Sequence, residues 1–300
     1  MIRRDILMRK IKLILAIFFI IFFSSYIVRA EENIIFEMND PVGDEYGPGT
    51  YTYPKNEQFS PYEGLFDLTY FKVEDGGEDY NFYFKFVSLT NPWHAKYGFS
   101  HQLIQLYISN GEEGSLETFK KGANVKFEDR HPWQKLIKVT GWSLEVFDYQ
   151  DDVDEDRRIN EDRIGVLDDK KTIKVSVPKN LVGDLTEAQY YLLIGSLDGF
   201  AYDNYREVVK DSQGWKFGGG SNTDINPNVI DTLVPEGMDQ REVLGGFDLE
   251  SGELSTLRAV GVELELHWKF TIIFGFLIIL VATIIGTGIK YVAKMFSNYD

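Results

Sequence analysis

Apolar and polar side chains alternate with a period of two over most of residues 33–266. Successive side chains of a β-strand point to opposite faces, so this alternation is typical of strands with one buried face. The clearest run places four aromatic rings on one face of a strand: Tyr80, Phe82, Phe84 and Phe86. A second run with Phe66, Leu68 and Tyr70 precedes it, and Asp75-Gly76-Gly77 lies between the two. The pattern predicts a β-hairpin.

Further strands are expected at 102–108, 142–149, 172–177 and 190–196. The polar stretch Asp168-Asp169-Lys170-Lys171 predicts a second hairpin, between 163–167 and 172–177. Clusters of Gly and Pro interrupt the chain elsewhere, and no internal repeat is visible. We therefore expect an all-β domain at 31–250, a two-layer antiparallel β-sandwich. Residues 251–269 are expected to form either a last strand or a stalk.

The N-terminal residues 1–30 are typical of a secretory signal peptide. A basic stretch at 3–12 is followed by an apolar run at 13–23, and Val28 and Ala30 occupy the −3 and −1 positions of a cleavage site. An uncleaved membrane anchor is the alternative. Both interpretations place the residues that follow outside the cytoplasm.

A 20-residue stretch without a charged side chain begins at Phe270 and ends at Ile289. As a helix it would be ~30 Å long, which matches the hydrocarbon thickness of a bilayer. Trp268 and Tyr291 flank the stretch as interfacial aromatic residues do. The prediction is a single-pass cell-membrane protein with an extracellular domain, a transmembrane helix at 270–289 and a cytoplasmic tail at 290–300. A buried helix of a soluble domain is the alternative.

Composition and charge exclude several kinds of protein. The chain has no cysteine and four histidines, which rules out disulfides and cysteine-ligated metals. Residues 31–269 carry 23 basic and 45 acidic side chains, a net charge of −22. Such a surface repels a phosphate backbone, so nucleic acid is not expected as a partner. The sequence motifs of serine hydrolases, phosphate-binding loops and zinc proteases are missing from the sequence, and we expect a non-catalytic protein.

An ordered set of segments carries a family resemblance. These segments are the Gly- and Pro-rich 40–54, then 64–69, Asn91-Pro92-Trp93, 214–220 and 227–231. Over residues 40–244 the chain resembles the C-terminal binding modules of glucodextranases and pullulanases, β-sandwiches related to DOMON-like domains. The resemblance implies a module that attaches to polysaccharide or to the cell surface.

Two acidic segments are candidate calcium sites. Glycines 43, 47 and 49 hold Asp40, Asp44 and Glu45 close together, and calcium accepts several carboxylate oxygens in loose geometry. The alternative is a turn in which the aspartates bond their own backbone. In the second segment Asp152, Asp154 and Asp156 have the spacing of an EF-hand loop. However, Arg157 replaces its glycine, so a solvated loop is the alternative.

Tryptophans in turn-like contexts are the candidates for sugar binding, because the C–H faces of pyranoses stack on aromatic rings. Trp93 with His94, Trp133 and Trp215 are the candidate residues, and Arg206 lies near them in sequence. Trp142 begins an alternating segment and is expected in the core. Two functions remain open: a membrane-anchored carbohydrate-binding module for α-glucan-type polysaccharide, and an interaction protein that docks an S-layer or surface complex of the cell envelope.

Overall fold

The computed structural model describes residues 33–152, 157–159 and 161–262, together with the single positions 275, 278 and 288. Within these residues the chain is mostly β-structure, and its short helices lie in the connections. The helices are α2 (Lys179–Val182) and α3 (Gln240–Leu244), with 3₁₀ turns at Glu57–Phe59, Glu161–Arg163 and Tyr202–Asn204.

The first sheet has five strands in the order β1-β2-β3-β9-β8, all antiparallel. Their bounds are β1 Ile34–Asn39, β2 Leu68–Asp75, β3 Asp79–Phe86, β8 Ile164–Val166 and β9 Thr172–Pro178. Both predicted hairpins are confirmed, because β2 pairs with β3 across Gly76-Gly77 and β8 pairs with β9 across residues 167–171.

The second sheet has the order β11-β10-β4-β6-β7, and β13 also pairs with β10. These strands are β4 Gln102–Ser109, β6 Lys135–Val139, β7 Leu144–Asp148, β10 Gln189–Ser196, β11 Val229–Thr232 and β13 Val260–Gly261. A short parallel pair, β5 (Val125–Phe127) with β12 (Ser255–Leu257), lies outside both sheets. Because β12 and β13 pair with other strands, the β-structure continues past residue 250.

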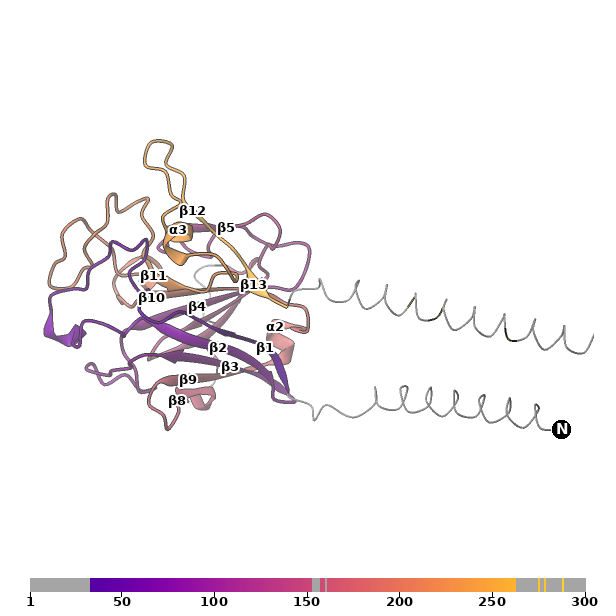
Figure 1. The fold of residues 1–300 in the computed structure, drawn as a ribbon. Helices are drawn as coiled ribbons and strands as arrows, with labels where there is room; N and C mark the ends of the chain where they lie inside the picture. Colours follow the sequence, from indigo (N-terminus) through magenta and orange to yellow (C-terminus); the bar gives the residue numbers. More distant parts are fainter. Residues whose placement is uncertain are drawn as a thin grey trace, which may run out of the picture.

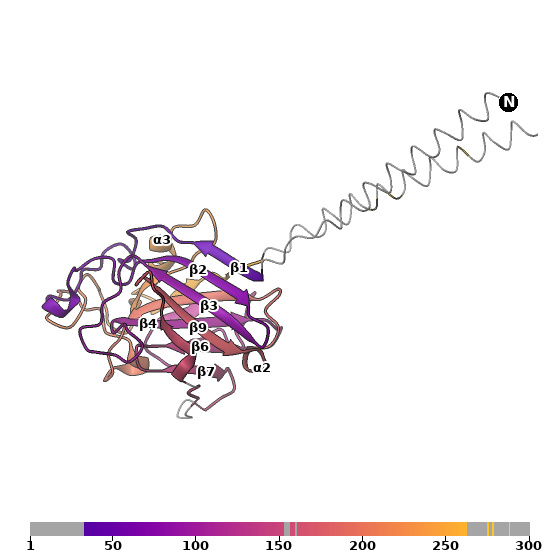
Figure 2. The same ribbon diagram turned by 90° about the horizontal axis from the view of Figure 1, so that it is seen from below.

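One hydrophobic core fills the space between the two sheets (Figures 1 and 2). Phe71 and Phe84 of the first sheet belong to the same fully buried cluster as Leu106 and Leu192 of the second. The inward positions of β3 are those that the alternation predicts, since Phe82, Phe84 and Phe86 are completely buried. An all-β architecture of stacked antiparallel sheets follows from this packing.

The outer face of the second sheet is also covered. All eight residues of β4 are buried, and a second core containing Tyr107, Trp133 and Tyr191 lies on that face. Figure 1 shows β5, β12 and α3 above it. This extra cover explains why β4 has apolar side chains on both faces.

No helix in the described part of the chain is long and apolar enough to cross a membrane. The predicted signal peptide at 1–30 lies outside the described residues. So do the membrane span at 270–289 and the tail at 290–300, except for positions 275, 278 and 288. These segments therefore remain predictions.

Candidate functional site

Two tryptophans from different loops lie close together, near the residues that precede β2 and β4. Trp93 lies in the loop between β3 and β4, and Trp215 lies in the loop between β10 and β11. Their ring centroids are 6.3 Å apart and their planes are tilted by 43°. Trp215 is 46% exposed and Trp93 is half-buried, so the pair presents aromatic surface to solvent. We call these two residues the tryptophan face.

A layer of buried rings supports the tryptophan face from below. Phe59 lies 6.2 Å from Trp93 and 6.0 Å from Trp215, measured between ring centroids. His101 is fully buried and its ring centroid is 4.5 Å from that of Trp93. Burial, together with the positive charge of Arg206, lowers the pKa of His101 to about 4, so the ring is neutral at pH 7.

Arg206 fixes the loop that carries Trp215. Its guanidinium donates hydrogen bonds to the carbonyl oxygens of Trp215 (2.8 Å) and Leu197 (2.6 Å), and it forms an ion pair with Asp198 at 3.2 Å. The same group lies 5.3 Å from the ring centroid of Phe59 and 6.0 Å from that of Trp215. A buried, fully engaged arginine holds its neighbours in one geometry, so the tryptophan face is preorganised.

The other sequence candidates have different environments. Trp133 is only 1% exposed, and its indole N–H donates to the carbonyl oxygen of Glu117 at 2.7 Å. The expectation that its turn-like context exposes Trp133 is therefore wrong, because the extra layer above β4 covers it. Trp142 is the opposite case: it lies in the turn before β7 and is 40% exposed rather than in the core. His94 is exposed, directly after Trp93, and has a positive φ of 53°.

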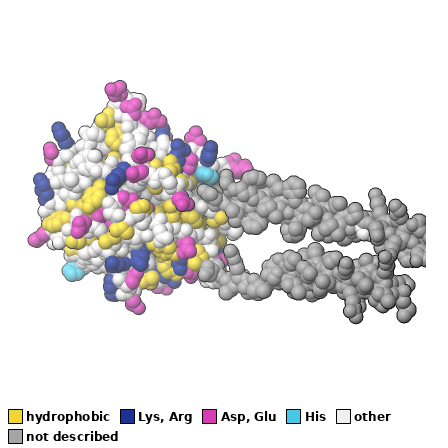
Figure 3. Space-filling view, in the orientation of Figure 1, with side chains coloured by type: hydrophobic (Ala, Val, Ile, Leu, Met, Phe, Trp, Pro, Cys, Tyr) yellow, Lys and Arg dark blue, Asp and Glu magenta, His cyan; other side chains and the backbone are white. Residues whose placement is uncertain are grey.

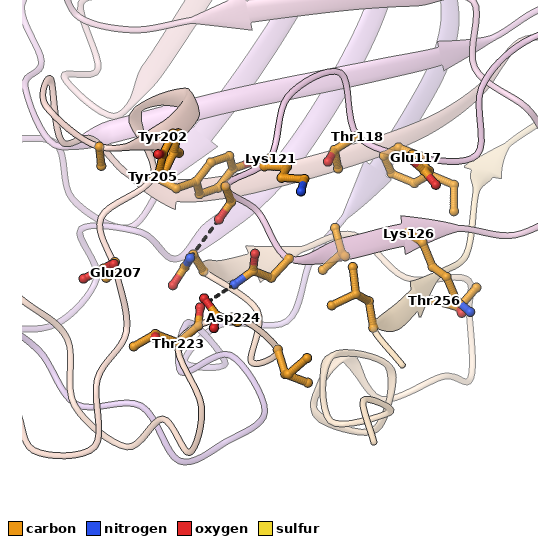
Figure 4. Close-up of a pocket in the computed structure, with 18 of the residues that line it drawn as sticks. Glu117, Thr118, Lys121, Lys126, Tyr202, Tyr205, Glu207, Thr223, Asp224 and Thr256 are labelled. Carbon is orange, nitrogen blue, oxygen red and sulfur yellow. Dashed lines mark hydrogen bonds between the residues drawn. The ribbon is translucent and has the colours of Figure 1, made fainter. Parts of the chain in front are cut away.

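A groove of about 1360 Å³ lies beside the second core, with Val125, Phe127 and Tyr205 among its lining residues (Figure 4). Lys216, the neighbour of Trp215, lines one part of it and forms an ion pair with Glu207. The side chains labelled in Figure 4 mix aromatic, charged and hydroxyl groups, as in sugar-binding clefts. Phe200 and Tyr202 on its lining are 104% and 85% exposed. Sequence reasoning missed both, although the turn residue Gly199 beside them was a signal.

The structure separates the three acids of the predicted calcium loop. Asp40 and Asp44 come together, and their carboxylate oxygens lie within 4.8 Å of one another and of Asp231 in β11. Glu45 points elsewhere: it accepts hydrogen bonds from the hydroxyl of Tyr53 (2.5 Å) and from the backbone N–H groups of Gly64 and Phe66. Glu45 therefore lies outside the group that Asp40 and Asp44 form with Asp231.

A fourth acid, Asp67, lies beside this group and is 2% exposed. Burial and the neighbouring acids Asp44 and Asp67 raise the pKa of Asp40 to about 9, and burial raises the pKa of Asp67 to about 7. A partial signal existed for Asp67 and Asp231, the two acids that were missed, since they lie in the segments 64–69 and 227–231 that carry the resemblance.

In the second acidic segment Asp152 is exposed, and Asp154 and Asp156 lie outside the described residues. Arg157 forms an ion pair with the neighbouring Asp151 at 2.7 Å. An acid paired with arginine in this segment is what the alternative to a calcium site, a solvated loop, predicts.

Comparison with models of known protein families gives a match over residues 35–259. The matching family is described as the C-terminal binding module, SLH-like, of glucodextranase. A search of curated proteins finds no match. The matched residues include both sheets, the tryptophan face and the four aspartates. The resemblance inferred from the sequence is thereby confirmed: the chain belongs to the family of SLH-like C-terminal binding modules of glucodextranase.

Proposed function

We propose that this protein is a non-catalytic carbohydrate-binding module, displayed outside the cell from a membrane helix at 270–289. Its ligand is an α-glucan-type polysaccharide, and its binding surface is the tryptophan face. The proposal is supported by membership of a family of binding modules together with the preorganised pair of Trp93 and Trp215.

The geometry of the tryptophan face suits a sugar ring. An exposed indole offers a flat apolar surface to the C–H face of a pyranose, and the two rings lie 6.3 Å apart with a tilt of 43° between their planes. Arg206 holds the rings, so little conformational entropy is lost on binding. The groove to which Lys216 contributes offers carboxylate, ammonium and hydroxyl groups that can bond to sugar hydroxyls.

Charge favours a neutral polymer over an acidic one. The described domain lies within residues 31–269, whose net charge is −22, and Figure 3 shows acidic and basic side chains interspersed over one face. A uronic-acid or phosphate polymer is repelled by such a net charge, whereas a glucan is not.

The test is affinity electrophoresis of the full-length chain through gels that contain soluble starch, pullulan or dextran. The detergent must lack a sugar headgroup, since a maltoside competes for the same surface. Loss of a central aromatic anchor typically costs about 2 kcal/mol or more of binding free energy. We expect Trp215→Ala and Trp93→Ala each to weaken retardation by about tenfold or more. Trp142→Ala is the matched control, because Trp142 is similarly exposed but lies in another turn.

The SLH-like description of the family favours one second function, docking to a polymer or protein of the cell envelope. In that case all α-glucan gels leave the wild-type chain unretarded, while purified envelope material retains it. Equal loss of retardation in Trp142→Ala and Trp215→Ala contradicts the assignment of the tryptophan face.

A further inference from the structure

Asp40, Asp44 and Asp231 come from two parts of the chain that are distant in sequence. Asp40 directly follows β1, Asp44 lies in the glycine-rich loop after it, and Asp231 lies in β11 on the opposite sheet. One carboxylate oxygen of each lies within 4.8 Å of the other two. Asp231 is completely buried and Asp40 is 7% exposed, so the group sits inside the protein and not on its surface.

Each of these side chains has an oxygen without a hydrogen-bond partner among the described residues: Oδ2 of Asp40, Oδ1 of Asp44 and Oδ1 of Asp231. Oδ1 of the neighbouring Asp67 is also unpartnered. The second oxygens of Asp231 and Asp67 are used, since the backbone N–H of Leu68 donates to Asp231 at 2.7 Å and that of Gly43 donates to Asp67 at 2.7 Å. Backbone contacts therefore orient these two carboxylates and leave one oxygen of each without a partner among the described residues.

No lysine or arginine in the described ranges forms an ion pair with any of the four aspartates. Buried carboxylates that face one another repel strongly, and an unpartnered buried oxygen costs about 1–3 kcal/mol. The cluster is stable only if protons or a cation neutralise it. The raised pKa values of Asp40 and Asp231, caused by burial and by the neighbouring acids, report this same repulsion.

We propose that Asp40, Asp44 and Asp231 bind one calcium ion, with the carboxylate of Asp67 adding negative charge beside it. All donors are oxygens, which is what hard cations prefer. Calcium tolerates loose coordination geometry, whereas Mg²⁺ requires a near-ideal octahedron and keeps several of its waters, so carboxylates on a loop and a strand suit calcium better.

Such an ion links the two sheets at one edge. Asp40 extends β1 of the first sheet, and Asp231 belongs to β11 of the second. Gln240 of α3 joins the same region, because its side chain donates to the carbonyl oxygen of Asp44 and accepts from the backbone N–H of Thr232 at 2.6 Å. The ion thus holds the glycine-rich loop, β11 and α3 together, and its role is structural and independent of sugar binding.

The test uses the full-length chain after chelator treatment, with and without added CaCl₂. We expect calcium at a hundredfold excess over its dissociation constant to raise the melting temperature by about 5–10 °C. Titration calorimetry should give one site, and Tb³⁺ should show tyrosine-sensitised emission that Ca²⁺ abolishes. Mg²⁺ at the same concentration should produce a smaller shift.

Variants separate this site from other acids. Asp231→Asn should remove the calcium-induced shift, and Asp44→Asn, at the half-buried rim, provides a second variant if the first fails to fold. Glu45→Gln and Asp152→Asn are the matched controls and should keep the shift. A wild-type chain that melts at the same temperature in chelator and in calcium, without Tb³⁺ emission, overturns the proposal. Loss of the shift in Asp152→Asn but not in Asp231→Asn also overturns it.

Discussion

Acid destabilisation through His101 is the prediction that the structure defines most sharply. The ring of His101 is fully buried among Phe59, Trp93 and the guanidinium of Arg206, and neither ring nitrogen has a partner among the described residues. Burial first, and the positive charge of Arg206 second, lower its pKa from 6.5 to about 4. The folded protein therefore keeps this histidine neutral where the unfolded chain protonates it.

The sign and size of the change in folding stability with pH follow from this difference in the pKa of His101 between the two states. Above about pH 6.5 neither state is protonated, so His101 has no effect on stability. As the pH falls from about 6.5 towards 4, only the unfolded state gains the proton, and folding loses ~1.4 kcal/mol per pH unit. Between pH 7 and pH 5 the loss is about 2 kcal/mol, and it reaches about 3 kcal/mol at pH 4.

The assay is urea unfolding of the full-length wild type and of His101→Phe, followed by tryptophan fluorescence at pH 7, 6 and 5. Other titrating groups contribute equally to both proteins, so the difference between the two pH profiles isolates His101. We expect the variant to gain about 2 kcal/mol relative to wild type between pH 7 and pH 5. Parallel profiles for the two proteins would refute the reasoning, because they would mean that His101 protonates as easily in the folded state as in the unfolded one.

Two further predictions concern the buried ion pair and the membrane segment. Lys138 and Asp203 form a 2.6 Å ion pair whose side chains are 7% and 1% exposed, so Lys138→Met should lower the free energy of unfolding by about 3–5 kcal/mol. Lys135→Met, which breaks the more exposed pair with Asp148, should cost less than about 1 kcal/mol in the same urea titration, and equal costs would contradict the argument. Deletion of residues 270–300 should release the protein from cells into the medium, as measured by immunoblot of both fractions; a truncated chain that stays with the cells contradicts the proposed anchor.

Local patterns predicted the parts of the fold that depend on neighbouring residues. The β2–β3 hairpin follows from four rings at alternate positions and a Gly-Gly turn, and both are found as expected. The cover over the outer face of β4 was not predictable in the same way. Gln105 interrupts the apolar pattern of β4, yet it is fully buried under this layer, where its side-chain amide donates a hydrogen bond to Asp203, 98 positions away.

The candidate site residues also divide into those that the local sequence predicted and those that depend on contacts between distant segments. Glycines near Asp40 and Asp44 indicated that these acids lie close together, and they do. Their third neighbour is Asp231 and not Glu45, because β11 lies at the edge of the other sheet. The contact between Asp231 and Asp40 spans about two-thirds of the chain, so local sequence does not predict it. Likewise Trp93 and Trp133 both follow a proline, but only the structure distinguishes the buried ring of Trp133 from the half-buried ring of Trp93.

Binding of α-glucan at the tryptophan face is tested most directly by ¹⁹F NMR. The full-length chain is labelled with 5-fluorotryptophan and titrated with a linear malto-oligosaccharide. Single Trp→Phe variants assign the resonances. We expect saturable shifts for the resonances of Trp93 and Trp215, with those of Trp133 and Trp142 unchanged. Saturating sugar that leaves the Trp93 and Trp215 resonances in place, or that shifts Trp142 instead, would contradict it.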